Sequence, residues 1–161
     1  MVYFLSFFGA LITLFLLIYI KWDFGRLSIR RKASVRNKQY ELERGQNFPI
    51  VLTSNKDAVA LFLSASCLTC HEVMENFNAL RQKWCDMEFE LFIRGSEEEI
   101  LYLIDKHKIS THFVKLNETD KKVYGVRVLP YMYYICRNNK VLSGGIINEI
   151  KDIEKIISLG T

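Results

Sequence analysis

The chain has 161 residues, half of them hydrophobic and a quarter charged, so it can bury a full core. This length suggests one domain with an appendage, because domains usually run to about 100–150 residues. The net charge of +4 comes from one segment, which argues against a generally basic nucleic-acid-binding protein.

Residues 1–20 contain no charged side chain and are predicted to form a transmembrane anchor. A helix of this length rises about 30 Å at ~1.5 Å per residue, which matches the hydrocarbon core of a bilayer. Tyr3, Tyr19 and Trp22 stand near its ends, where amphipathic rings favour the membrane interface. The alternative is a cleaved signal peptide, which typically has a basic start, a shorter apolar run and a small-residue cleavage site.

A basic linker, residues 21–47, follows the anchor. Eight basic and three acidic side chains lie between Lys21 and Gly45, so the linker carries the net positive charge of the chain. We expect it to contact anionic lipid head groups rather than nucleic acid. Basic residues beside a transmembrane helix favour the cytoplasmic side, which would place the following domain inside the cell.

The remaining domain, residues 48–161, alternates apolar runs with amphipathic segments. Strands are predicted at 48–53, 58–63, 88–93, 112–116, 131–136 and 141–147, and helices at 67–84, 97–107, 119–126 and 148–159. This order predicts an α/β fold, a three-layer sandwich with helices on both faces of a mixed central sheet.

Two of the predicted helices carry detailed signals. Ser96 and Glu99 have the spacing of a capping box at the start of the second helix. Its apolar side is predicted to comprise Ile100, Leu101, Leu103 and Ile104, and the buried face of the first helix Val73, Phe77, Leu80 and Trp84.

The stretch SASCLTCHEVM carries the candidate chemistry, with Cys67 and Cys70 two residues apart and His71 directly behind. A CxxC pair at the start of a helix is typical of a dithiol redox centre, whereas CxxCH is also a haem c attachment motif. A metal site is a third interpretation, but it needs a second ligand pair at short spacing. Cys85, His107 and His112 are scattered along the chain.

Cys67 falls at a strand-to-helix junction, where free N–H groups and the helix dipole favour a thiolate. It is therefore predicted to be the exposed nucleophile, with Cys70 one turn deeper and able to close the disulfide. His71 is either a cation that tunes the pair or a solvent-facing residue of the first turn. Glu72 is a second possible tuning residue.

Leu129 and Pro130 precede the apolar strand YMYYIC. A proline here cannot donate a ladder hydrogen bond, and a cis bond would suit a tight turn. We interpret the pair as a substrate groove in which the Leu129 backbone pairs with an extended client peptide. An ordinary trans proline at a strand start is the alternative.

Taken together, these parts resemble the thioredoxin superfamily. The shared parts are the strand AVALFL, the CLTC motif opening a helix, Leu-Pro before YMYYIC, a final hairpin and a terminal helix. The 63 positions from Cys67 to Pro130 leave room for the extra strand–helix unit of membrane-anchored TlpA-like relatives. Four groups of residues in this chain are similar to features of the MauD-like branch. They are Phe62-Leu63-Ser64 with Cys67 and Cys70, Gly95 with Glu99 and His107, Tyr124-Gly125-Val126 with Pro130-Tyr131, and Gly145 with Asn148.

The resemblance implies a single-pass membrane protein whose domain works outside the cytoplasmic membrane as a thiol–disulfide oxidoreductase. Its expected partners are client protein thiols and disulfides and a redox partner that resets the CxxC pair, with no cofactor or metal. The sequence departs from thioredoxins proper, which carry a buried acid six residues before the first cysteine; here that position is Leu61. Proton removal from Cys70 would then fall to Glu72 or water.

Three alternatives remain open at this point. The chain could be a non-catalytic thioredoxin-like module that binds or matures a partner, or a haem c protein. Its domain could also lie in the cytoplasm. Cys85 and Cys136 could form a second disulfide, although we favour two buried free thiols, because cysteine packs as a small hydrophobic residue.

Overall fold

The computed structural model describes residues 41–50 and 55–161 of the chain. The predicted anchor, most of the predicted linker and residues 51–54 lie outside this range. Within the described residues no helix is both long and apolar enough to span a membrane. The strand predicted at 48–53 is only partly covered, and Phe48 lies in a loop rather than in a strand.

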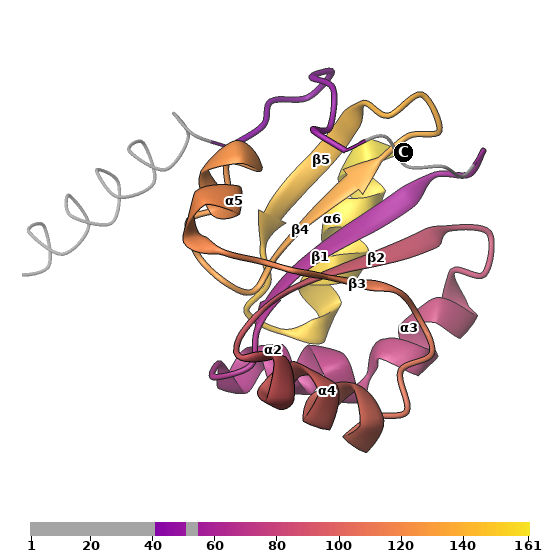
Figure 1. The fold of residues 1–161 in the computed structure, drawn as a ribbon. Coiled ribbons are helices and arrows are strands. Elements are labelled where there is room, and N and C mark those ends of the chain that lie inside the picture. The colour runs from indigo at the N-terminus through magenta and orange to yellow at the C-terminus, as the bar shows by residue number, and fades with distance from the viewer. Residues whose placement is uncertain (1–40, 51–54) are drawn as a thin grey trace, which may run out of the picture. The chain divides into compact units, whose positions relative to one another are not determined.

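A five-stranded mixed sheet forms the centre of the domain, in the order β3-β2-β1-β4-β5 (Figure 1). The strands are β1 (Ala58–Ser64), β2 (Glu88–Arg94), β3 (Phe113–Lys115), β4 (Tyr131–Ile135) and β5 (Val141–Ile146). Strands β1, β2 and β3 are parallel, whereas β4 runs antiparallel to both β1 and β5. The predicted mixed sheet is therefore confirmed, and the fully buried β1 lies at its centre.

The helices follow the predicted order with one difference. They are α2 (Leu68–Glu75), α3 (Phe77–Lys83), α4 (Glu97–Lys106), α5 (Glu118–Val123) and α6 (Ile150–Gly160). The single helix predicted at 67–84 is wrong, because Asn76 ends α2 and begins α3. The Asn76 amide donates to the Glu72 carbonyl at 2.9 Å, and such local bonding by asparagine competes with a regular helix.

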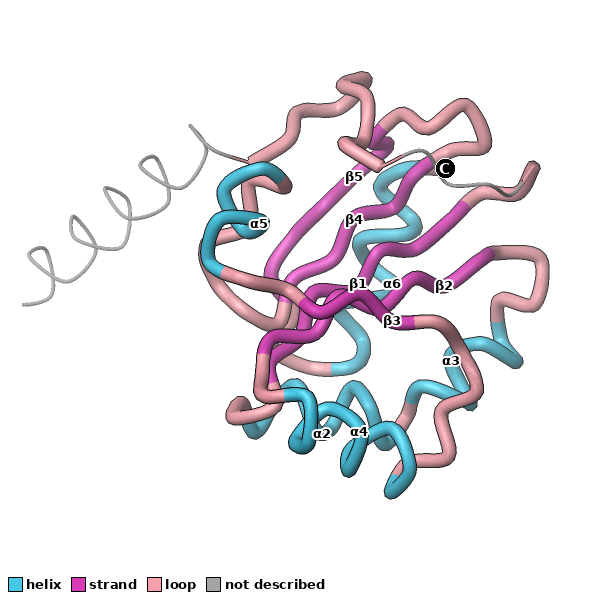
Figure 2. The backbone as a smooth tube through the Cα atoms, in the orientation of Figure 1, coloured by secondary structure: helices cyan, strands magenta, loops and turns pink. Residues whose placement is uncertain are grey.

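The helices cover the two faces of the sheet unequally (Figure 2). Side chains of α2, α3, α4 and α6 pack with Val59, Leu61 and Leu63 in the larger core. No α5 side chain is fully buried, but α5 lies on the opposite side of the sheet in the view of Figure 1. The predicted three layers are present, and most of the helical packing lies on one face.

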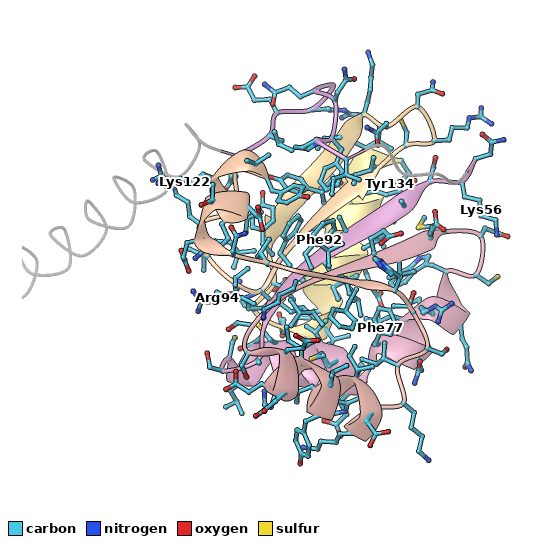
Figure 3. The ribbon with its side chains drawn as sticks, viewed as in Figure 1. Lys56, Phe77, Phe92, Arg94, Lys122 and Tyr134 are labelled. Carbon is cyan, nitrogen blue, oxygen red and sulfur yellow. The ribbon has the colours of Figure 1, made fainter. Side chains whose placement is uncertain are left out.

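The second face is closed largely by aromatic rings. The rings of Phe62 and Phe92 stack at a centroid distance of 4.6 Å, and Phe48 packs on both and on Tyr124 and Tyr133. Figure 3 labels Phe92 in this aromatic cluster. Phe48 thus brings residues before β1 onto the sheet as a packed loop, where the sequence predicted a strand.

Helix α4 begins as predicted, with a capping box between Ser96 and Glu99. Its predicted apolar side is too wide, because Ile100 and Leu103 are buried whereas Leu101 is exposed. The stripe that faces the core is therefore narrower than the apolar residues of the sequence suggest.

Candidate active site

Cys67 occupies the N-cap position of α2, with φ −106° and ψ 123°. Strand β1 ends at Ser64, and the Cys67 N–H donates to the Ser64 carbonyl at 3.2 Å, which turns the chain from strand to helix. The Cys67 sulfur accepts from the Cys70 N–H at 3.4 Å, as a serine or aspartate oxygen does at other helix starts. The first turn of α2 therefore directs a hydrogen-bond donor and the positive end of the helix dipole at this sulfur.

The two cysteines of the motif differ in their access to solvent. Cys70 is fully buried in the larger core, whereas Cys67 is partly exposed. Burial raises the pKa of the Cys70 thiol well above its usual value, and a hydrogen bond with the Cys67 side chain raises it further. Cys67 is therefore the more exposed of the two cysteines, and Cys70 lies behind it, where burial favours the protonated thiol.

Leu129 and Pro130 lie at the same end of the sheet as Cys67. The Leu129 carbonyl lies 3.9 Å from the Cys67 sulfur, and the Leu129–Pro130 peptide bond is cis. Pro130 is buried, and its carbonyl accepts from the Ile147 N–H at 3.1 Å. The structure thus brings the predicted groove residues together with the predicted nucleophile.

His71 is not a solvent-facing residue of the first turn. Its Nε2 lies 2.6 Å from the carbonyl oxygen of Ala65, and the side chain is half-buried. A carbonyl oxygen only accepts hydrogen bonds, so Nε2 carries the hydrogen. His71 therefore holds the loop that leads into Cys67.

Glu72 and Cys70 lie on different sides of α2. Two residues apart on a helix correspond to about 200° of rotation, and accordingly Glu72 is exposed whereas Cys70 is buried. The structure does not bring together the predicted proton acceptor and the thiol that it would serve. Leu61, at the thioredoxin acid position, is a fully buried apolar residue of β1.

Arg94 belongs to the site, although its role was not predicted. It ends β2 beside Ser64, and its carbonyl accepts from the Ala65 N–H at 2.8 Å. Its guanidinium donates to Glu118 of α5 at 3.0 Å, and its positive charge partly offsets the rise in the pKa of Cys70, a smaller influence than burial. Figure 3 labels Arg94 at this end of the sheet. In the sequence, the signal that could have indicated this role was the positive charge of Arg94 directly after the run EFELFI.

Cys85 and Cys136 are free thiols, as are the two cysteines of the motif. The expectation that both are buried is wrong for Cys85, which is exposed, and Cys136 is partly buried. The helix that precedes Cys85 ends at Lys83, so the cysteine falls in a surface turn beyond the packed face.

The site geometry does not fit a haem c group. The axial histidine of a CxxCH site binds the iron through Nε2, but the Nε2 of His71 lies 2.6 Å from the Ala65 carbonyl oxygen. The second cysteine of the motif lies in the core, where a thioether to a porphyrin could not form without opening α2. Among residues 41–50 and 55–161, no three His, Cys, Asp or Glu side chains are arranged to hold a metal ion.

Solved structures share this architecture. A chain described as a DsbE-type thiol:disulfide interchange protein from Chlorobium tepidum aligns with a TM-score of 0.65 and 16% identity, over 74% of this chain and 99% of its own. The thioredoxin domain of a thiol-disulfide oxidoreductase from Bacteroides vulgatus aligns with a TM-score of 0.59 and 16% identity, over 71% and 98%. A secreted disulfide oxidoreductase from Mycobacterium tuberculosis aligns with a TM-score of 0.52 and 12% identity, over 65% and 82%.

These likenesses define the fold as thioredoxin-like. No protein-family model and no curated protein sequence matches the chain. Within the described domain, Cys67 and Cys70 stand at the start of the helix that follows the central strand, and Leu129-Pro130 stands before an antiparallel neighbour of that strand.

Proposed function

We propose that the protein is a thiol–disulfide oxidoreductase that exchanges disulfides with client proteins through Cys67 and Cys70. The observation that carries the proposal is the difference between two adjacent sulfurs. Cys67 is partly exposed at the N-terminus of α2, and the Cys70 thiol is buried one turn behind it. Structural neighbours described as a thiol:disulfide interchange protein and as a thiol-disulfide oxidoreductase support the same chemistry.

Reduction of a client would proceed in two exchanges. The Cys67 thiolate attacks one sulfur of a client disulfide, which forms a mixed disulfide and releases the other client sulfur as a thiolate. Cys70 then loses its proton to that departing thiolate or to water and attacks the Cys67 sulfur. The Cys67–Cys70 disulfide forms, and the second client sulfur leaves; oxidation of a client is the same sequence in reverse.

The backbone of Leu129 is placed to hold a client during this exchange. Its carbonyl lies beside the Cys67 sulfur, so a client held against the Leu129 backbone would have its own sulfur close to the nucleophile. Main-chain pairing with an extended peptide gives affinity without a requirement for a particular client sequence. A redox partner that restores the starting state of the CxxC pair would use the same surface.

The cellular setting is a further part of the proposal. We expect residues 1–20 to anchor the protein by one membrane pass, the basic linker to contact lipid head groups, and the domain to act outside the cytoplasmic membrane, as in MauD-like proteins. The charge of the linker favours the opposite orientation. A C-terminal reporter active only outside the cytoplasm tests this: activity supports the proposal, and activity of a cytoplasm-only reporter contradicts it.

Trapping tests the chemistry. The variant Cys70→Ser should accumulate mixed disulfides between Cys67 and clients in cells, because the second exchange has lost its nucleophile. The matched variant Cys67→Ser should trap little, since its remaining motif thiol is buried. Capture by Cys67→Ser alone would reverse the two roles. A cellular phenotype that survives Cys67→Ala would instead favour the non-catalytic binding module.

A further inference from the structure

The loop between β1 and α2 is held tightly on its β2 side. Ala65, the first residue of this loop, donates its N–H to the Arg94 carbonyl at 2.8 Å. Gly95 follows directly, and a Cβ at that position would lie only 2.8 Å from the Cβ of Ala65. The close approach of the two backbones therefore requires glycine, and it leaves Ala65 no room to move toward β2.

The helix side of the loop is held by His71. Its Nε2–H donates to the Ala65 carbonyl at 2.6 Å, across six positions of the chain. The His71 backbone N–H donates to the Cys67 carbonyl at 3.1 Å, so both ends of this residue bind the segment that contains the nucleophile. Ala65 is thus bonded through its N–H to β2 and through its carbonyl to α2.

We infer that His71 is a positioning residue for the exchange reaction of Cys67: it fixes the Ala65 carbonyl and thereby the geometry at the N-terminus of α2. This role rests on the proposed function. A half-buried carbonyl that loses its donor is costly, so the loop would turn to find another partner. Cys67 lies only two residues further along, and its sulfur would lose alignment with the Cys70 N–H, now 3.4 Å away.

The hydrogen bond, rather than a positive charge, is the active feature of His71. Nε2 carries its hydrogen in the imidazolium and in the neutral tautomer that this bond selects, so the bond survives loss of the proton from Nδ1. Two amide variants test which ring nitrogen matters. The side-chain amide of glutamine reaches about as far as Nε2 of histidine, whereas that of asparagine reaches only as far as Nδ1. His71→Gln should therefore keep the bond, and His71→Asn should lose it.

Alkylation of the reduced full-length chain with iodoacetamide at neutral pH, followed peptide by peptide by mass spectrometry, measures the effect. We expect His71→Asn to slow modification of Cys67 by about fivefold, the factor that corresponds to one typical hydrogen bond, and His71→Gln to stay within about twofold of the parent. The exposed Cys85 is an internal control whose rate should not change. Modification of the buried Cys70 would report unfolding.

A second variant keeps the test decisive if His71→Asn unfolds. Gly95→Ala places a new Cβ against Ala65 from the other side while His71 stays intact, and it should also slow the alkylation of Cys67. Equal rates in His71→Asn, His71→Gln and the parent, or an unchanged rate in Gly95→Ala, would overturn the positioning role. Failure of the proposed function would look different, because the parent would then alkylate normally at Cys67 and yet not exchange with a disulfide-bonded peptide.

Discussion

The Cys67 sulfur contacts the Leu129 carbonyl oxygen at 3.9 Å, although 62 residues separate the two in sequence. The sheet register produces this contact. Phe62, near the end of β1, pairs with Tyr131, at the start of the antiparallel β4, so the segments beyond them meet at one end of the sheet. A client that reaches Cys67 must therefore also meet the residues that flank Leu129.

The surface around this contact includes two exposed apolar side chains. Leu68, next to Cys67, is 87% exposed, and Val128, next to Leu129, is 43% exposed. We predict that Val128→Asp lowers the rate of exchange with a protein disulfide by about fivefold to tenfold, because a client would have to desolvate the new charge. Reaction with a small aromatic disulfide should change by less than about twofold. Stopped-flow assays with both substrates measure the two rates.

The control for this prediction is Leu159→Asp, which adds the same charge at a 69% exposed leucine near the end of α6. It should leave both rates as they are. If it slows the protein substrate as much as Val128→Asp does, the effect is one of net charge and the apolar surface near Cys67 has no special part in client binding.

The stability of the reduced protein should fall at alkaline pH because of Cys70. Burial raises the pKa of this thiol above its usual value of 9.0, so the folded state keeps a proton that the unfolded state releases. The resulting stabilisation is complete below about pH 9 and is lost above it, at about 1.4 kcal/mol per pH unit. The oxidised protein has no such thiol and should lack this slope.

Melting temperatures between pH 8 and pH 10.5 check the difference between the two redox states. Burial raises the pKa of Tyr133 to about 12 in the reduced structure, and its ionisation should largely cancel in the comparison. The reduced Cys70→Ala variant should behave like the oxidised protein. Equal slopes for the reduced and oxidised parent would mean that Cys70 is not buried as a thiol in solution.

The strands and the position of the dithiol could be predicted from sequence, because both depend on local patterns. The apolar run AVALFL can only be a buried strand or helix segment, and the polar stretch that follows it ends the run before a CxxC pair. The mixed sheet then follows from alternation with helices in the first part of the domain, which gives parallel strands, and from the hairpin near its end, which gives antiparallel ones. These inferences use neighbours in sequence, and the structure reproduces the five strands predicted from residue 58 onward to within a few residues.

The contacts that position the dithiol could not be predicted in the same way. The bond of His71 to Ala65 depends on how tightly the loop turns, and the approach of Arg94 to Ser64 depends on the register between two strands. The register between two strands cannot be read from the sequence of either strand alone. The break at Asn76 likewise involves a local hydrogen bond of its side-chain amide to the Glu72 carbonyl, which competes with a regular helix.

Phe48 should be a major source of stability despite lying outside any strand. Its ring is buried among four other aromatic rings of the second core. We predict that Phe48→Ala lowers the free energy of unfolding by about 3–5 kcal/mol through lost burial and the cavity left behind. Ile50→Ala, at a 38% exposed residue two positions later, should cost less than about 1 kcal/mol. Urea unfolding measures both, and equal losses would argue that Phe48 does not insert into the core.

Arg94 should control how quickly a mixed disulfide is resolved. Its charge lowers the pKa of Cys70 and thus increases the small fraction of thiolate available to attack Cys67. Glu118 accepts hydrogen bonds from Lys121 and Arg94, which lower the pKa of its carboxyl group and keep it as a counter-charge at neutral pH. Arg94→Gln should therefore slow the second exchange by about threefold, and Glu118→Gln should accelerate it by a similar factor, since the energies of such half-exposed pairs are small.

The measurement uses the full-length chain carrying glutathione on Cys67, with release of glutathione followed by mass spectrometry at neutral pH. Lys122→Gln removes an exposed positive charge from the helix that carries Glu118 and leaves the Arg94–Glu118 pair in place (Figure 3). Opposite changes in Arg94→Gln and Glu118→Gln, with Lys122→Gln unchanged, would establish that this one guanidinium acts on Cys70. A slower release in Lys122→Gln equal to that in Arg94→Gln would show instead that only the overall charge of the domain matters.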